Sequence, residues 1–244
     1  MEKPCKRKEK SSQAGTDLTE GTPTHSCCPG KPRRHQIMLV DDHPMTRLGL
    51  AELFATQADL QLCCEAAEPE AAMRDLQRCP PDLLILDIGL PGRGGLELMK
   101  DVHAAYPKLP VLVYSMHDES LYAERALRDG ARGYVMKSAG ASVILQAIRH
   151  ILDGHVFLSP IMSQKVFSIF AGQQQHGSPI DNLTDRELEV LEKIGQGQNT
   201  RQIAKDLRLS PKTIESHRGN IKMKLNCPDT TSLLRFAVCW VEEN

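Results

Sequence analysis

The sequence has no continuous apolar run of about 18 residues, the length that a helix needs to cross a bilayer. Its Lys-rich amino terminus is not followed by an apolar segment, so it lacks the pattern of a secretory signal peptide. The eight cysteines show neither CxxC spacing nor the paired Cys/His blocks that hold zinc. We therefore expect a cytoplasmic protein with reduced thiols and no contact with a membrane.

A large net charge is also missing, because the 244 residues carry a formal charge of −1. The charges are nevertheless unevenly distributed. Residues 36–155 contain eleven basic and seventeen acidic side chains, whereas residues 181–244 contain ten of each. An acidic segment suits a metal-dependent phosphoryl site. A neutral segment must gather its positive charge on one face if it is to bind nucleic acid.

Composition and periodicity divide the chain into four parts. Residues 1–35 are rich in Lys, Ser, Thr, Gly and Pro, and we expect a disordered basic tail, since so few large apolar side chains cannot offset the entropy of ordering. Residues 36–155 and 181–244 are each long enough to bury a core of their own. Residues 156–180 have the composition of a linker, with room for one helix.

In the first of these two domains, short apolar runs alternate with amphipathic stretches. Such alternation predicts a parallel sheet whose strands are joined by helices. The five predicted strands are Ile37–Val40, Leu60–Cys64, Leu83–Leu86, Val111–Tyr114 and Gly133–Met136.

Acidic side chains follow two of these predicted strands. Asp41 and Asp42 end the first strand, and Asp87 ends the third. Functional groups gather at the carboxyl ends of strands in open parallel sheets, so we expect the three carboxylates to lie close together. Carboxylate oxygens are the natural ligands of Mg²⁺, and the main-chain carbonyl of Gly89 would complete the share that the protein supplies.

Two further polar side chains end strands at the same edge, Ser115 after the fourth and Lys137 after the fifth. A carboxylate can act as a nucleophile toward a phosphoryl donor when a cation screens both charges, and a hydroxyl and an ammonium would attract the product. Any one of the aspartates alone is more often a helix cap or a solvated loop residue. Their combination with Ser115 and Lys137 favours a phosphoryl site.

The second domain reads as four short helices over residues 184–243, with no strand. Thr184 is followed three residues later by Glu187, which is the pattern of a capping box. Ser210 and Pro211 are typical of the start of another helix. On that helix the inward positions are expected to be Ile214, Ile221 and Leu225.

The positive charge of this neutral domain is concentrated on and around this same helix. From Arg208 to Leu225 there are five basic side chains and one acidic side chain. A polar helix face with basic flanks suits the major groove of DNA, because Lys and Arg neutralise phosphates while shorter side chains meet base edges. An ordinary solvated face is the alternative for the charges alone, and His217 is expected to be structural. The predicted DNA-binding residues are Lys212, Thr213, Glu215, Ser216, Arg218, Asn220 and Lys222.

Residues 36–155 resemble the receiver domain of bacterial two-component response regulators. The resemblance is carried by Leu39-Val40-Asp41-Asp42-His43-Pro44, Asp87-Ile88-Gly89-Leu90-Pro91-Gly92, Tyr114-Ser115-Met116-His117-Asp118-Glu119 and Gly133-Tyr134-Val135-Met136-Lys137. It implies that Asp87 accepts phosphate from a sensor histidine kinase and that Asp41, Asp42 and the Gly89 carbonyl hold Mg²⁺. It also implies that Lys137 contacts the phosphoryl group and that Ser115 and Tyr134 form the switch pair. Gly89 departs from the larger residue that is usual there, which puts the lifetime of the phosphate in question.

Residues 182–240 resemble the LuxR-type helix-turn-helix, on Leu183-Thr184-x-Arg186-Glu187-x-Glu189-Val190-Leu191, Ser210-x-x-Thr213-Ile214-x-x-His217 and Ile221-x-x-Lys224-Leu225. The two resemblances together define the NarL/FixJ class. They imply a flavodoxin-like five-stranded parallel sheet followed by an all-α four-helix DNA-binding domain. The implied protein is a phosphorylation-controlled transcriptional regulator and not an enzyme. The partners implied are a sensor histidine kinase, promoter DNA, a second copy of the chain on activation, and RNA polymerase.

Two alternatives remain open. A metal-dependent aspartyl phosphatase also uses an Asp nucleophile after an apolar strand, but it needs a second Asp two residues on, where this chain has Gly89. A regulator that binds DNA without phosphate control is the other alternative, and the presence of every pocket residue argues against it.

Overall fold

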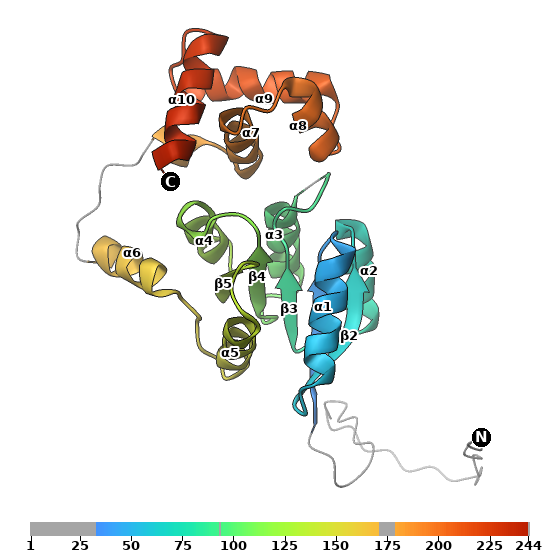
Figure 1. The fold of residues 1–244 in the computed structure, drawn as a ribbon. Helices are drawn as coiled ribbons and strands as arrows, with labels where there is room; N and C mark the ends of the chain where they lie inside the picture. Colours follow the sequence, from blue (N-terminus) through green and yellow to red (C-terminus); the bar gives the residue numbers. More distant parts are fainter. Residues whose placement is uncertain (1–32, 93, 171–178, 244) are drawn as a thin grey trace, which may run out of the picture. The chain divides into compact units, whose positions relative to one another are not determined.

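A computed structural model describes residues 33–92, 94–170 and 179–243 (Figure 1). Residues 1–32 of the predicted tail and residues 171–178 of the predicted linker lie outside this described part. None of the helices in the described part is long and apolar enough to cross a membrane.

A five-stranded parallel sheet forms the centre of the first domain. Its strands are β1 (His35–Val40), β2 (Leu60–Ala66), β3 (Leu83–Leu86), β4 (Val111–Ser115) and β5 (Gly133–Met136). They lie in the order β2-β1-β3-β4-β5, which is the flavodoxin-like order. The predicted fold class is therefore confirmed.

Five helices connect and follow these strands: α1 (Pro44–Ala55), α2 (Pro69–Arg78), α3 (Gly95–Ala105), α4 (Glu119–Arg128) and α5 (Ala141–Leu152). Side chains of the strands alternate between the two faces of the sheet, and each face buries its own core. One core includes residues of α2, α3 and α4, and the other includes residues of α1 and α5. The whole of β3 is buried because helices cover both faces, which explains its unbroken apolar run.

The start of α3 lies very close to the end of β3. A Cβ atom placed on Gly95 would lie 2.2 Å from the carbonyl oxygen of Asp87 and 2.5 Å from Cα of Ile88. Only glycine fits this approach, and the Gly95 N–H donates to the Ile88 carbonyl at 3.0 Å. Backbone packing thus holds the start of α3 against Asp87 and Ile88.

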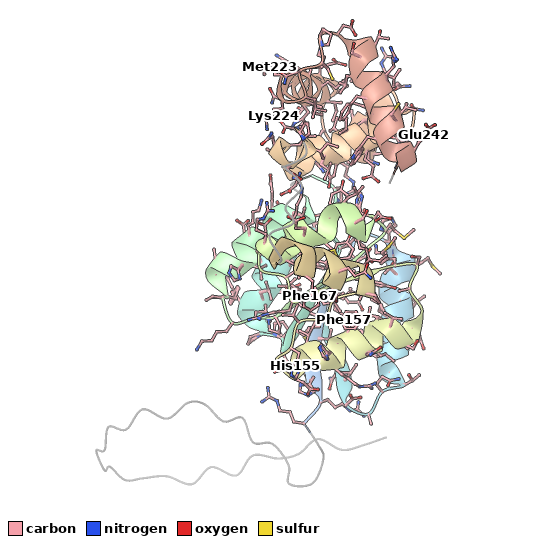
Figure 2. The ribbon with its side chains drawn as sticks, turned by 90° about the vertical axis from the view of Figure 1, so that its left-hand side faces the viewer. His155, Phe157, Phe167, Met223, Lys224 and Glu242 are labelled. Atoms are coloured by element: carbon pink, nitrogen blue, oxygen red, sulfur yellow. The ribbon has the colours of Figure 1, made fainter. Side chains whose placement is uncertain are left out.

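A helix, α6 (Pro160–Phe170), occupies part of the predicted linker. Met162 on this helix is buried, whereas Phe167 is 74% exposed (Figure 2). A 3-10 turn over Pro179–Asn182 then leads into the second domain.

The second domain is all-helical, as predicted. Its helices are α7 (Asp185–Gly195), α8 (Thr200–Asp206), α9 (Pro211–Lys224) and α10 (Thr230–Glu243). Thr184 and Glu187 form the predicted capping box at the start of α7, and the Ser210 hydroxyl accepts from the Thr213 N–H at the start of α9. The core of this domain includes Leu188, Ile203 and Leu233, one from each of three helices.

Candidate phosphoryl site and DNA-binding helix

The carboxylates predicted to meet do lie together at the carboxyl edge of the sheet. Asp41 follows β1 and Asp87 follows β3, and both are almost completely buried, at 1% and 2% exposed. The N–H of Asp87 donates to the Val40 carbonyl at 2.8 Å, which holds the ends of the two strands in register. Burying two carboxylates is costly unless a cation faces them, so this arrangement requires a positive partner.

Lys137 supplies a positive charge from the end of β5. Its Nζ atom lies 2.7 Å from Oδ2 of Asp41 and 2.5 Å from Oδ2 of Asp87. Burial of the ammonium group opposes its charged form, but the neighbouring Asp87 and Asp41 outweigh this effect and raise the pKa of Lys137. Burial also raises the pKa of Asp41, although its contact with Lys137 acts in the opposite direction.

Two further donors of the pocket converge on one oxygen of Asp87. The Ser115 hydroxyl donates to Oδ1 of Asp87 at 2.8 Å, and the N–H of Gly89 donates to the same oxygen at 2.9 Å. Tyr134 is buried, and its hydroxyl donates to the carbonyl of His117 at 2.9 Å. Burial raises the pKa of Tyr134, so its hydroxyl remains a donor over the whole physiological range.

His43 joins this pocket, and the sequence reasoning gave it no role. Its Nδ1 lies 2.9 Å from Oδ1 of Asp42 and 3.3 Å from Oδ1 of Asp41. Ligand atoms of Asp41, Asp42, His43 and Asp87 all lie within 4.8 Å of one another. The signal for His43 was its position directly after the acidic pair, one residue before the Pro that begins α1.

The donor set fits a hard divalent cation. Oδ2 of Asp41 and Oδ1 of Asp42 are buried and have no hydrogen-bond partner among the described residues, although Lys137 and His43 lie close to them. Three carboxylates against one lysine leave an excess of negative charge that a divalent cation would neutralise. This cluster is therefore a candidate metal site.

Gly89 leaves space next to the phosphoryl site. A Cβ atom at this position would lie 3.4 Å from Nε2 of His117 and 3.5 Å from Oδ1 of Asp87. The imidazole of His117 thus lies where a larger residue at position 89 would contact it. The main-chain N–H of Gly89 contacts Asp87, while the metal contact of its carbonyl stays a prediction.

In the second domain, α9 presents most of its predicted DNA-binding residues to solvent. Lys212, Glu215, Ser216 and Asn220 are exposed, whereas Thr213, Arg218 and Lys222 are partly buried. On the opposite side Ile214 and Ile221 are fully buried, as predicted, and Leu225 at the end of the helix is partly buried. The helix therefore has the amphipathic form expected of a groove-binding element.

Some polar residues of α9 also bind other helices of the domain. The Thr200 hydroxyl donates to Oε1 of Glu215 at 2.6 Å, and Nη1 of Arg218 donates to Thr200 Oγ1 at 3.4 Å. Thr200, at the start of α8, was not identified from the sequence. His217 is partly buried, its Nδ1 has no hydrogen-bond partner among the described residues, and burial lowers its pKa. Its structural role stays a prediction.

Comparison with known proteins gives the family of both domains. Residues 37–149 match the response regulator receiver domain, and residues 181–237 match the bacterial regulatory proteins of the luxR family. Transcriptional activator protein ExaE of Pseudomonas putida is 36% identical over 203 residues, which cover 83% of this chain and 95% of ExaE. The chain belongs to the NarL/FixJ class of response regulators.

Two further relatives of this response regulator agree with that membership. Response regulator GacA of Pseudomonas aeruginosa is 32% identical over 203 residues, which cover 83% of this chain and 95% of GacA. A solved structure of the RcsB response regulator of Salmonella typhimurium is 25% identical with a TM-score of 0.54, and covers 85% of this chain and 100% of that one.

Lys224 is one of the five basic side chains between Arg208 and Leu225, but in the structure it pairs with a carboxylate of α7. Its Nζ donates to Oε2 of Glu187 at 2.6 Å, and the N–H of Thr184 donates to the same oxygen at 2.8 Å. Figure 2 labels Lys224 beside the exposed Met223. Burial alone would raise the pKa of Glu187, but Lys224 and Thr184 outweigh it and hold that pKa below its ordinary value of 4.5.

We expect Glu187→Gln to destabilise the DNA-binding domain by about 1–3 kcal/mol at neutral pH, because Lys224 and the Thr184 N–H lose a charged acceptor. The depressed pKa of Glu187 means that its contribution is complete above the ordinary value of 4.5 and is lost as the pH falls through the lower folded value. Denaturant unfolding followed by Trp240 fluorescence measures this, because Trp240 is the single tryptophan and is buried on α10.

Glu242→Gln is the matched control, since Glu242 is exposed near the end of α10 (Figure 2). The control should unfold like the unmodified protein. A Glu187→Gln protein with unchanged stability, or a difference that persists undiminished in acid, would show that the pair with Lys224 contributes nothing.

Proposed function

We propose that this response regulator is switched by phosphorylation of Asp87, and that the phosphorylated form pairs with a second copy and binds promoter DNA through α9. The proposed donor is a phosphohistidine of a sensor kinase. The observation that carries the proposal is that Lys137, Ser115 and the Gly89 N–H all converge on the buried carboxylate of Asp87.

In the proposed transfer, a carboxylate oxygen of Asp87 forms a bond to phosphorus while the bond from phosphorus to the histidine nitrogen of the kinase breaks. Asp87 then carries an acyl phosphate, and the kinase histidine is released. Lys137 and Ser115 already contact the two oxygens of Asp87, so both stand ready to donate to phosphoryl oxygens. These donors favour the added charge without a large rearrangement.

Asp41, Asp42, Asp87 and the carbonyl of Gly89 are the proposed ligands of Mg²⁺. When bound, Mg²⁺ screens the repulsion between the carboxylate and the incoming phosphoryl group. The support is the excess of buried negative charge, since Lys137 is the lysine that lies against the carboxylates of both Asp41 and Asp87. His43, in contact with Asp42, helps to hold that carboxylate in place.

Ser115 and Tyr134 are the proposed switch pair. A phosphoryl group on Asp87 would attract the Ser115 hydroxyl, which now donates to the carboxylate. Tyr134 lies on the neighbouring strand, paired with Val113 of β4, and its hydroxyl anchors the backbone just after Ser115 through His117. A shift of Ser115 would therefore be passed to the β4–α4 loop as a local change in charge and packing.

Lys212, Arg218 and Lys222 are the proposed phosphate contacts on α9, and Thr213, Glu215, Ser216 and Asn220 are the proposed residues near base edges. Two copies would place two such helices on half-sites about one DNA turn apart, and this multiplies affinity and specificity. In this proposal the protein works in the cytoplasm, and the bound dimer would contact RNA polymerase. ExaE, to which the chain is similar, is named a transcriptional activator.

Phosphoryl incorporation tests the proposal directly. The full chain with Mg²⁺ and a small phosphodonor such as acetyl phosphate should gain one phosphoryl group by intact-mass spectrometry. Asp87→Asn should gain none, and Asp153→Asn, which changes an exposed aspartate of the same domain, should behave like the unmodified protein. Equal incorporation in Asp87→Asn would show that the acceptor lies elsewhere.

A further inference from the structure

Three cysteine thiols meet at the edge of the sheet, away from the acidic pocket. The Sγ atoms of Cys63, Cys64 and Cys79 all lie within 4.8 Å of one another. All three side chains are partly buried, and none of them is in a disulfide. Cys63 and Cys64 belong to β2, which lies at the edge of the sheet (Figure 1). Cys79 is the C-cap residue of α2.

A β-bulge explains how two consecutive strand residues can serve one site. Neighbouring residues of a regular strand point to opposite faces of the sheet. In β2, however, Ile37 of β1 pairs with Leu62 and Met38 pairs with Cys64, so Cys63 is the extra residue of the bulge. A bulge re-aims a side chain locally, and here it lets both thiols approach the same third sulfur.

The third thiol is held by the end of α2. The N–H of Cys79 donates to the carbonyl of Asp75 at 2.9 Å, and Pro80 and Pro81 follow directly. Ala72 and Leu76 of α2 are fully buried in the same core against which Cys63 and Cys64 pack. The sulfur atoms are therefore positioned by packed elements, as a preformed site requires.

We propose that Cys63, Cys64 and Cys79 bind a soft, thiophilic metal ion, Cu(I), through three thiolates. Thiolate sulfur selects soft ions such as Cu(I) over hard ions such as Mg²⁺. A structural zinc site takes four protein ligands, whereas among the described residues this group of ligand atoms holds three sulfurs and no His, Asp or Glu. The thiols are partly exposed, which gives an ion a path to them.

A disulfide is the competing use of these thiols. A disulfide would join two of the three sulfur atoms and give the third no role. Burial, together with the neighbouring thiols, raises the pKa of Cys63, and burial raises the pKa of Cys64, so these two thiols supply little thiolate to react with an oxidant. A metal ion that displaces the protons uses all three sulfurs.

The test is a titration of the reduced full chain with Cu(I) under nitrogen, in competition with a chromophoric Cu(I) chelator. Because Cys5, Cys27 and Cys28 lie outside the described residues, the reference protein carries Ser at those three positions. We expect one ion per chain, and an affinity that falls about 10-fold or more in each of Cys63→Ser, Cys64→Ser and Cys79→Ser. Cys227→Ser with Cys239→Ser, which changes two free thiols of the other domain, is the matched control.

X-ray absorption of the loaded reference protein counts its ligands without any change to the site, and three sulfur neighbours are expected. The proposal is overturned if the reference protein does not bind Cu(I), if the single variants bind as tightly as the reference, or if fewer than three sulfurs surround the ion. Tighter binding of Zn²⁺ than of Cu(I) would also overturn it. Phosphoryl incorporation at Asp87 is measured separately, so a failure here leaves the proposed function untouched.

Discussion

Lys137→Met is expected to abolish the gain in DNA affinity that a phosphodonor gives. The Lys137 ammonium lies 2.7 Å from Asp41 and 2.5 Å from Asp87, with only 5% of its side chain exposed. Methionine has a similar length but no charge, so the phosphoryl group would lose its buried cation. Removing one partner of a buried ion pair typically costs about 3–5 kcal/mol, and unfolding in denaturant should show part of this loss.

The response to the phosphodonor is measured as the ratio of the DNA affinities with and without it, in the presence of Mg²⁺. Lys108→Met is the control, because Lys108 is an exposed lysine of the same domain. Mg²⁺ should restore part of the stability of Lys137→Met, since it neutralises the same carboxylates, but it should not restore the response. A full response in Lys137→Met would show that Lys137 does not act on the phosphoryl group.

The second large effect is expected from the double change Lys212→Ala and Lys222→Ala on α9. Lys212 is exposed and Lys222 is partly exposed on the polar side of this helix, opposite Ile214 and Ile221. Each lysine that contacts a DNA phosphate contributes about 1 to the slope of log affinity against log salt. The double variant should therefore bind all DNA fragments more weakly, with a slope smaller by about 2.

Binding isotherms at four or more salt concentrations give the slope. Arg235→Ala is the matched control, because Arg235 is an exposed cation of α10 in the same domain. An unchanged slope in the double variant, or an equal loss in Arg235→Ala, would contradict the assignment of α9 to the DNA surface.

The sequence was sufficient to predict the sheet and the positions of its functional groups. The strand Leu83–Leu86 was predicted with its observed bounds, because burial on both faces requires an unbroken apolar run. Asp41, Asp87 and Lys137 could be expected to meet, since parallel strands bring their carboxyl ends to one edge. The parallel arrangement of the strands is therefore enough to predict which residues form a large part of the candidate phosphoryl site.

What the sequence did not reveal depends on local geometry. β2 extends to Ala66, beyond the predicted end at Cys64. It also contains a bulge that the residue pattern did not predict. The cysteines looked scattered because Cys64 and Cys79 meet only when α2 returns along β2. The contacts of Lys224 with Glu187 and of Thr200 with Glu215 likewise depend on how the helices pack.

Phosphorylation of Asp87 is proposed to control the affinity of this protein for DNA. The most direct test measures the affinity of the full chain for genomic promoter fragments at one fixed salt concentration with Mg²⁺, with and without a small phosphodonor, and repeats it with Asp87→Ala. The predicted result is a gain of about 5- to 150-fold, the usual range of allosteric coupling, in the unmodified protein and none in Asp87→Ala. Specific binding that is the same with and without phosphodonor, or a gain that survives in Asp87→Ala, would contradict the claim.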